Sequence, residues 1–511
     1  MIERRALLKL AVGALAGAAG WPGATAALAQ PSPEPAAFKP GDVLDMARDL
    51  AKRPFRAASS ALPDPFGNLA YEQYVAIRPR PEAAIWAAET IGFALEPLHR
   101  GFIFSAPVAL FVIENGAARR LTYSRAMFDF GKLQPPVDLP DIGFSGFRVL
   151  HPNEGGVLLE TAIFQGATFF RAVARGQNLG AAARGLSIRT ADPRGEEFPV
   201  FRAFWIEKPT LAGNALVVHA LLDSDSVAGA FRFTLRPGEA SIIDIECTLI
   251  ARTVVDHFGL GAMGAIAYSG ALDRRRIDDI RPAVREIGGV QMLNGKNEWL
   301  WRPVSNRETL QISAFVDENP RGFGFLQRDR DFAAYQDDDQ HWEQRPSIWI
   351  EPIGEWGPGQ VQLVEIPSDS EVNDNIIAYW RPRAPLLAGV EAPFAYRQFW
   401  CWTPPERPGL AIVTTSRAGR APGPAGGKRR RFLVEFSSDA FADARNMDVR
   451  LNLTAGGGSI IAPRTFCYPE RKAYRVMFDL DPGSETASEL RLALEIGGKA
   501  ISETWLFRWT A

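Results

Sequence analysis

The sequence predicts an all-β protein made of two sandwiches, a large N-terminal one and a smaller immunoglobulin-like one at the C-terminus. Three observations predict this fold class. Short segments rich in β-branched and aromatic residues recur along most of the chain, separated by Gly, Pro, Asn and Asp. Several of these segments alternate polar and apolar residues, as half-buried antiparallel strands do. A proline-rich break near residue 405 then divides a long block of strands from a short one.

The first residues have the character of an export signal. Arg4 and Arg5 stand before two leucines and a lysine, and a weakly apolar stretch follows that closes on a small-x-small pattern at residues 27–29. The apolar part is too short for a membrane span. The paired arginines predict a twin-arginine signal, with an ordinary basic signal as the alternative. We therefore expect a signal peptide at residues 1–29, a tether at 30–37 and a periplasmic protein.

Composition excludes several classes of function. The formal net charge of −2 argues against a surface that binds nucleic acid. The five histidines are scattered without the spacing of metal ligands, and three cysteines are too few for a disulfide framework. No glycine pattern of a phosphate loop or a dinucleotide site follows a strand. We expect neither a metal nor an organic cofactor.

The large domain is predicted to span residues 38–403 and to begin with one helix. The segment "GDVLDMARDLAKRPF" can be capped by Asp42, and its apolar residues fall on one helical face. That face consists of Val43, Leu44, Ala47, Leu50 and Ala51. So many strands after the helix favour a large sandwich. The predicted strands are 108–114, 120–124, 147–152, 215–222, 230–238, 241–252, 310–316, 347–352, 361–366, 375–380 and 394–402.

A short linker is predicted at residues 404–408, inside "TPPERPG", because its prolines cannot continue a central strand. Residues 409–511 then hold about seven short strands in about a hundred residues, which is typical of an immunoglobulin-like sandwich. These strands are 410–415, 431–437, 447–453, 459–463, 473–480, 489–496 and 503–509.

Aromatic and charged residues crowd together between about residues 297 and 380. Sugars have apolar faces and hydroxyl rims, so sugar sites pair aromatic rings with planar polar groups. The alternative is a tryptophan-rich core with charges on its surface. The tryptophans of this region are Trp299, Trp301, Trp342, Trp349, Trp356 and Trp380.

Asp374 stands in "EVNDNIIAYW", between two asparagines and just ahead of an apolar run. Asn and Asp commonly mark turns, because their side chains bond the nearby backbone. The residue types alone therefore leave two interpretations open, a turn and a working carboxylate.

Longer stretches resemble a known family. "GFSGFRVLHP", "DENPRGFGFLQRDRDF", "RPSIWIEPIGEWGPGQVQLVEIPSDSEVNDNIIAYW" and the closing "SETW" are similar to the periplasmic glucan biosynthesis proteins, called OpgG and OpgD (formerly MdoG and MdoD). The resemblance covers the chain from about Phe38 to its end. The twin-arginine-like signal resembles the OpgD branch more closely.

The resemblance implies a galactose-mutarotase-like sandwich followed by an immunoglobulin-like one. It also implies a role in making osmoregulated periplasmic glucans, whose backbone is β-1,2-linked glucose. Some members are inverting β-1,2-glucanases, and related ones are inverting transglycosylases that use a glucan hydroxyl as acceptor. A non-catalytic glucan-binding partner of a membrane glucan synthase is a third possibility. A second copy of the chain is a further candidate partner.

By the same resemblance, Asp374 matches the general acid, which must keep its proton near neutral pH, and Glu371 matches a substrate-binding position. The stretch "RPAVREIGG" places Glu286 where the family has its aspartate base, and Arg285 where it has a histidine. Three interpretations of Glu286 stay open: a working base, a weak or absent base with a sugar hydroxyl as acceptor, and an ordinary loop residue.

Other positions depart from the family pattern. Trp342 replaces a tyrosine, so an aromatic platform would remain without its hydroxyl, and Leu179 replaces another tyrosine. The stretch at 261–270 also differs. Arg345 and Trp349 are predicted to bind substrate, with packing as the alternative for "RPSIW". We therefore expect the substrate, the bond position or the acceptor to differ from that of the best-understood members.

Overall fold

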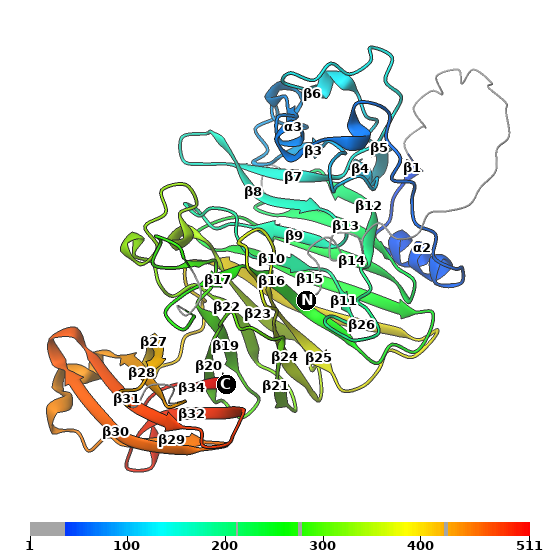
Figure 1. Ribbon diagram of the computed structural model, residues 1–511. Helices are drawn as coiled ribbons and strands as arrows, with labels where there is room; N and C mark the ends of the chain where they lie inside the picture. The colour runs from blue at the N-terminus through cyan, green and yellow to red at the C-terminus, as the bar shows by residue number, and fades with distance from the viewer. Residues whose placement is uncertain (1–35, 211–212, 274–277, 424–427) are drawn as a thin grey trace. The chain divides into compact units, whose positions relative to one another are not determined.

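The structure is a computed structural model that describes residues 36–511, apart from 211–212, 274–277 and 424–427. The predicted signal peptide and nearly all of the predicted tether lie outside the described residues. Almost every described element is a β-strand, which confirms the all-β prediction (Figure 1). No helix in the described part of the chain is long and apolar enough to cross a membrane.

The larger sheet has 16 strands within the described residues. It is antiparallel except where β12 pairs with β4 and where β20 pairs with β34. In spatial order its strands are β1 (Ala36–Ala37), β5 (Ala117–Arg120), β4 (Ala109–Glu114), β12 (Val200–Glu207), β13 (Leu216–Asp223), β14 (Val227–Arg236), β15 (Ser241–Ala251), β26 (Glu391–Cys401), β23 (Ser347–Ile353), β22 (Gly322–Leu326), β19 (Gly289–Leu293), β20 (Trp299–Pro303), β34 (Thr504–Thr510), β32 (Ala487–Ile496) and β29 (Arg450–Ala455), with β33 (Lys499–Ala500) beside β32.

The second sheet has ten described strands and carries the candidate site. Its order is β21 (Gln311–Asp317), β24 (Gly359–Glu365), β25 (Ile376–Pro382), β16 (Phe258–Ala265), β10 (Ala182–Arg184), β9 (Phe169–Ala172), β8 (Leu158–Gln165), β7 (Gly146–Pro152) and β3 (Ala94–Leu98), with β11 (Ser187–Ile188) also on β16. Two small ribbons pair β17 (Ala267–Ser269) with β18 (Val284–Arg285), and β2 (Arg78–Pro79) with β6 (Phe128–Asp129).

Helices are short and few in the described residues. The α-helices are α2 (Gly41–Ala51) and α3 (Tyr71–Val75). The 3₁₀ turns are η1 (Phe66–Asn68), η2 (Pro81–Ala83), η3 (Arg125–Met127), η4 (Phe332–Ala334), η5 (Trp342–Gln344), η6 (Asp439–Asn446) and η7 (Pro469–Arg471).

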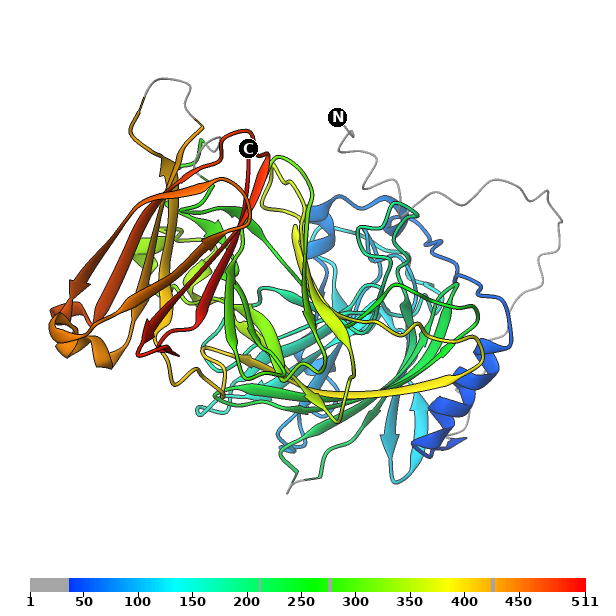
Figure 2. The same ribbon diagram turned by 90° about the horizontal axis from the view of Figure 1, so that it is seen from below.

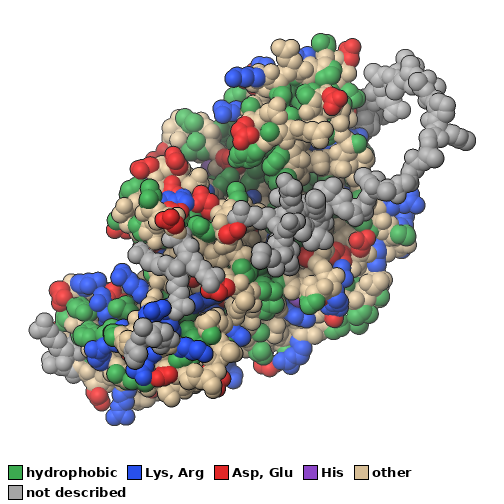
Figure 3. All heavy atoms as spheres, viewed as in Figure 1, with side chains coloured by type: hydrophobic (Ala, Val, Ile, Leu, Met, Phe, Trp, Pro, Cys, Tyr) green, Lys and Arg blue, Asp and Glu red, His purple; other side chains and the backbone are tan. Residues whose placement is uncertain are grey.

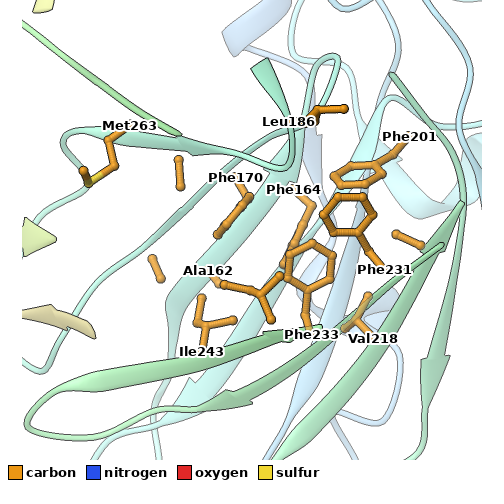
Figure 4. Close-up of a cluster of buried hydrophobic side chains, with 14 of the residues drawn as sticks. Ala162, Phe164, Phe170, Leu186, Phe201, Val218, Phe231, Phe233, Ile243 and Met263 are labelled. Carbon is orange, nitrogen blue, oxygen red and sulfur yellow. The ribbon is translucent and has the colours of Figure 1, made fainter. Parts of the chain in front are cut away.

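The main core fills the space between the two large sheets. Phe170 of β9 packs edge-to-face on Phe233 of β14, with ring centroids 5.4 Å apart, and Phe164 of β8 meets the same ring at 5.3 Å (Figure 4). Edge-to-face contacts are a preferred geometry for aromatic rings. Because side chains alternate along a strand, the neighbours of Phe170 on β9 must point to the other, outer face of the ten-stranded sheet.

Helix α2 forms where predicted, and its predicted apolar face packs on β13, β14 and β15. The cap differs from the prediction. Pro40 occupies the N-cap, and Asp42 lies inside the helix, where its carboxylate accepts the N–H of Lys39 at 2.8 Å. The expectation that Asp42 caps the start was therefore wrong, because proline is already tolerated at the helix entrance.

Most predicted strands form within a few residues of their expected bounds. The exception is 120–124, since β5 ends at Arg120 and Leu121 begins a stretch without strand structure. Several strands were not predicted at all. The clearest is β16, whose sequence "FGLGAMGA" holds three glycines, a residue type that usually weakens a strand.

The last eight strands form two facing layers around a cluster of their own (Figure 2). One layer is the four-stranded sheet of β27 (Ile412–Arg420), β28 (Arg430–Ser437), β31 (Ala473–Asp481) and β30 (Ser459–Tyr468). The other is the end of the larger sheet, made of β34, β32 and β29, with β33 beside β32. This agrees with the expected immunoglobulin-like sandwich, while the exact domain boundaries stay a prediction.

A buried ion pair explains the closing "SETW". Glu503, with no exposed surface, accepts both terminal nitrogens of Arg328, the N–H of Val413 at 2.6 Å and the amide of Gln291 at 3.0 Å. The guanidinium of Arg328 also lies 3.6 Å from the ring centroid of Trp301. These partners come from β19, β20, the end of β22 and the start of β27, so one carboxylate joins the two sandwiches.

We expect Glu503→Ala to lower the free energy of unfolding by about 3–5 kcal/mol, because it leaves the Arg328 charge buried without a partner. Urea unfolding measures this. The matched control is Glu489→Ala, which breaks a surface pair with Arg508 and should cost about 1 kcal/mol or less. Equal losses in the two variants would contradict the assignment.

Candidate active site

The carboxyl of Asp374 lies over β16 at a place where a glycine leaves room for it. Asp374 is half-buried and precedes β25 by two residues, and β25 pairs with β16 so that Ile377 faces Gly264. A Cβ added at Gly264 would lie only 2.8 Å from Oδ2 of Asp374. The missing side chain therefore allows the carboxyl to approach the outer face of the sheet.

Asn375 holds the backbone next to Asp374. Its N–H donates to the carbonyl of Ala265 at 3.0 Å, its Oδ1 accepts the N–H of Ala267 at 2.8 Å, and its Nδ2 donates to the carbonyl of Ala267 at 3.0 Å. The same Nδ2 reaches the carbonyl of Ile366 at 3.2 Å. Because Asn375 is buried and fully engaged with neighbouring strands, the position of Asp374 is set by the sheet.

Glu286 lies beside the same stretch of chain. It follows β18 and is 5% exposed. Its N–H donates to the carbonyl of Ile266 at 2.9 Å, and its Oε2 accepts the N–H of Ile266 at 3.0 Å. Asp374 and Glu286 are thus held by residues 264–267, and the structure brings these two predicted residues together.

The pKa of Glu286 reflects the proximity of Asp374. Burial, followed by the negative charge of Asp374, raises the pKa of Glu286 to about 7. The hydrogen bond from Ile266 and the positive charges of Arg345 and Arg171 act in the opposite direction. A carboxyl in such surroundings can exchange a proton near neutral pH.

A network of ion pairs and hydrogen bonds around Arg281 places Glu371 and Trp342 near each other. Arg281 binds the carboxylates of Glu371, Asp337 and Asp279, and the indole Nε1 of Trp342 donates to Oδ2 of Asp337 at 2.8 Å. The charge of Glu371 is therefore paired with an arginine. Acidic side chains gather in this part of the surface, over the loops beside β17 (Figure 3).

Arg345 covers the ring of Trp342, with its Cζ 5.3 Å from the ring centroid. Trp342 is only 2% exposed, so its ring offers no open platform, contrary to expectation. The Nη2 of Arg345 donates to Gln340 at 2.8 Å, while its buried Nε has no hydrogen-bond partner. Arg345 thus contacts the ring of Trp342 and lies close enough to Glu286 to interact with its charge: burial lowers the pKa of Arg345, and the negative charge of Glu286 opposes this.

Trp349 is not part of this group. It is fully buried on β23, its ring stacks on Trp299 at 5.8 Å, and it packs in a separate cluster that includes Phe399 and Cys401. The packing alternative for "RPSIW" describes Trp349, and a ring without exposed surface cannot contact a substrate.

Four residues of the site were not predicted from the sequence: Arg171, Gly264, Arg281 and Asn375. Sequence patterns could have identified two of these residues. Arg171 alternates with the core residues of β9, and Asn375 stands in the same motif as Asp374. The role of Gly264 could not be predicted from the sequence, because it depends on which side chain lies above this glycine in the fold.

Two further observations concern binding sites. Within the described ranges no group of three or more His, Cys, Asp or Glu side chains is arranged to hold a metal ion. A hollow of about 570 Å³ lies elsewhere, beside α2, and contains neither Asp374 nor Glu286.

Comparisons with known proteins identify the family of this chain. Residues 38–509 match the family model described as "Periplasmic glucan biosynthesis protein, MdoG". The chain belongs to this family. "Glucans biosynthesis protein G" of Vibrio cholerae is 42% identical over 475 residues, 93% of this chain and 87% of that protein. The protein of the same name from Rhodopseudomonas palustris is 43% identical over 490 residues, 96% of this chain and 97% of its own.

The family membership confirms the resemblance found in the sequence and implies a periplasmic protein. The branch within the family stays a prediction, because the signal lies outside the described residues. Among solved structures, a galactose mutarotase related enzyme from Lactobacillus acidophilus aligns with a TM-score of 0.21 and 8% identity, over 46% of this chain and 96% of that one. A score this low carries no argument.

We expect Glu286→Gln to remove a pH dependence of stability. The folded state raises the pKa of Glu286 to about 7, so it binds the proton more tightly than the unfolded chain. Wild type should therefore lose stability relative to the variant as pH rises from about 4.5 to about 8, by on the order of 3 kcal/mol. Urea unfolding of both proteins at the two pH values measures this.

The control for this comparison is Glu489→Gln, at an exposed carboxylate, which should follow wild type at both pH values. If Glu286→Gln also followed wild type, Glu286 would not hold a proton in the fold.

Proposed function

We propose that this protein acts on the β-1,2-linked glucan backbone of osmoregulated periplasmic glucans, as an anomer-inverting glucanase. The observation that carries the proposal is the pair of Asp374 and Glu286, two carboxyls that share one electrostatic environment on the outer face of the ten-stranded sheet. Glycoside hydrolysis canonically needs two such groups.

In this mechanism Asp374 is the general acid. It gives its proton to the glycosidic oxygen as the bond to the anomeric carbon breaks, and positive charge develops on the sugar ring. Glu286 is the general base. It takes a proton from the attacking water, whose oxygen bonds to the anomeric carbon from the opposite face, so the configuration inverts.

The surroundings of Glu286 suit a base. A pKa of about 7 lies near the working pH, where the carboxylate is both available and basic enough to take a proton. Arg171 and Arg345 favour the ionised form that this step requires. Glu371 and its partner Arg281 can contact sugar hydroxyls at the rim, since Glu371 is more than a third exposed.

Transglycosylation is the second candidate, because the same two carboxyls can serve it with a glucan hydroxyl in place of water as the acceptor. We further propose export by the twin-arginine route. A membrane glucan synthase and a second copy of the chain are proposed partners.

Asp374→Asn should abolish turnover of linear β-1,2-glucan, with a loss of at least about 10²-fold, because asparagine cannot donate the proton. Reducing ends and anomeric NMR signals, followed together, measure it. New reducing ends of inverted configuration indicate the glucanase, and new anomeric signals without reducing ends indicate the transglycosylase. A wild-type protein that binds glucan but changes neither signal would be a non-catalytic binding partner.

Gly264→Ala should lower kcat by about 10²-fold with little loss of stability. The new methyl group would displace the Asp374 carboxyl, and a shift of about 1 Å is enough for such an effect. Gly419→Ala, on β27, is the matched control, since a Cβ there meets no atom within 4 Å. Unchanged turnover in Gly264→Ala would show that Asp374 need not lie against β16.

A further inference from the structure

The outer face of the ten-stranded sheet continues past the carboxyl pair. Ala182 of β10 faces Gly264 of β16, so the side chain of Ala182 points to the side of the sheet where Asp374 lies. Arg184 lies two residues further along β10 and points to the same side, about 6.6 Å away along the strand. Phe169 of β9 faces Arg184. This row lies on β9, β10 and β16, which run side by side (Figure 1).

Arg184 supports two aromatic rings on this face. Its Cζ lies 4.6 Å from the ring centroid of Phe169 and 5.8 Å from that of Phe198. The side chain of Arg184 is 8% exposed and its buried Nε has no hydrogen-bond partner. A guanidinium held against ring faces stabilises them by a cation–π contact.

Phe198 itself is 53% exposed, although most large aromatic rings of this protein are buried. Its segment is firmly held, because Glu197 forms a bridge with Ile188 and accepts the N–H and the hydroxyl of Ser226 at 2.8 and 2.7 Å. An exposed ring on a fixed segment keeps one face available at little cost in conformational entropy.

A fixed carboxylate lies beside the ring. One oxygen of Glu196 accepts Nη1 of Arg184 at 2.7 Å and the hydroxyl of Thr190 at 2.8 Å. The side chain of Glu196 is 21% exposed, so it can still accept from a ligand hydroxyl. An open ring next to an oriented carboxylate matches the apolar face and hydroxyl rim of a sugar.

We propose that Phe198, supported by Arg184 and flanked by Glu196, forms a separate subsite for a glucosyl unit of the glucan, beyond the unit that contacts Asp374. The inference rests on the proposed function for the identity of the ligand. The subsite binds a sugar unit that does not react, so it contributes to affinity and to the preference for long chains.

The test is Phe198→Ala, with KM and kcat measured on linear β-1,2-glucan and on short β-1,2-glucooligosaccharides. KM for the long glucan should rise about three- to tenfold, as expected for the loss of one stacked ring. The value of kcat should change by less than about twofold, because the lost contact is present in both ground and transition states. The shortest oligosaccharides should be affected least, and Phe198→Trp should restore the KM.

Phe466→Ala is the matched control, since it removes an exposed ring from β30 on the C-terminal sandwich. An unchanged KM in Phe198→Ala, or an equal rise for short and long substrates, would overturn the subsite.

These measurements also distinguish a failure of the proposed subsite from a failure of the proposed reaction. If wild type does not turn over the glucan, the proposed reaction fails, and the subsite is then judged by direct binding of the same glucan. Weaker binding to Phe198→Ala than to wild type would support the subsite, while equal binding, or no binding by either protein, would overturn it.

Discussion

The structure around the site depends on one steric constraint, which is that β16 carries almost no side chain on its outer face. A Cβ at Gly259 would lie 2.4 Å from the ring of Tyr379, and one at Gly264 would lie 2.8 Å from Asp374. On its other face the same strand supplies Met263 to the core (Figure 4). Strand β16 can therefore contribute to the core on one side and leave room for Tyr379 and Asp374 on the other.

The same constraint explains what could be predicted from the sequence. Strands with β-branched and aromatic residues, such as β15 and β25, were predicted nearly to the residue, because their composition and alternation are local signals. Strand β16 was missed, since its glycines argue locally against a strand and are required only by side chains far away in the sequence, such as Tyr379, Ile350 and Asp374. Asp374 and Glu286 were found through motif resemblance, and their closeness needed the fold. Trp342 was misjudged as an open platform because its burial against Ala283, Val284 and Tyr335 is a tertiary effect.

The glutamate at position 286 is accommodated by the backbone. The sequence resemblance implies an aspartate at this position, and the extra methylene of a glutamate moves the carboxyl by a distance that matters for catalysis. Here Oε2 is bound by the N–H of Ile266, in the same segment that Asn375 fixes through Ala265 and Ala267. The carboxyl is thus anchored to the segment of chain that also positions Asp374, the proposed acid. Because Glu286 and the neighbour of Asp374 are both hydrogen-bonded to residues 265–267, a few hydrogen bonds set the distance between the two carboxyls.

Charge balance is the last requirement on this pair. Two carboxylates cannot both ionise cheaply in a buried place, so the pair tends to retain one proton. An inverting reaction begins with one protonated and one ionised carboxyl. In the free protein the raised pKa of Glu286 favours the proton on Glu286 below about pH 7, so the proposed mechanism requires this proton to leave Glu286 before water is activated. Arg171 and Arg345 favour a negative charge on Glu286, and neither forms a direct ion pair with it among the described contacts. Direct pairing would hold Glu286 permanently ionised and weaken it as a base, whereas arginines at a distance allow its pKa to stay near neutrality.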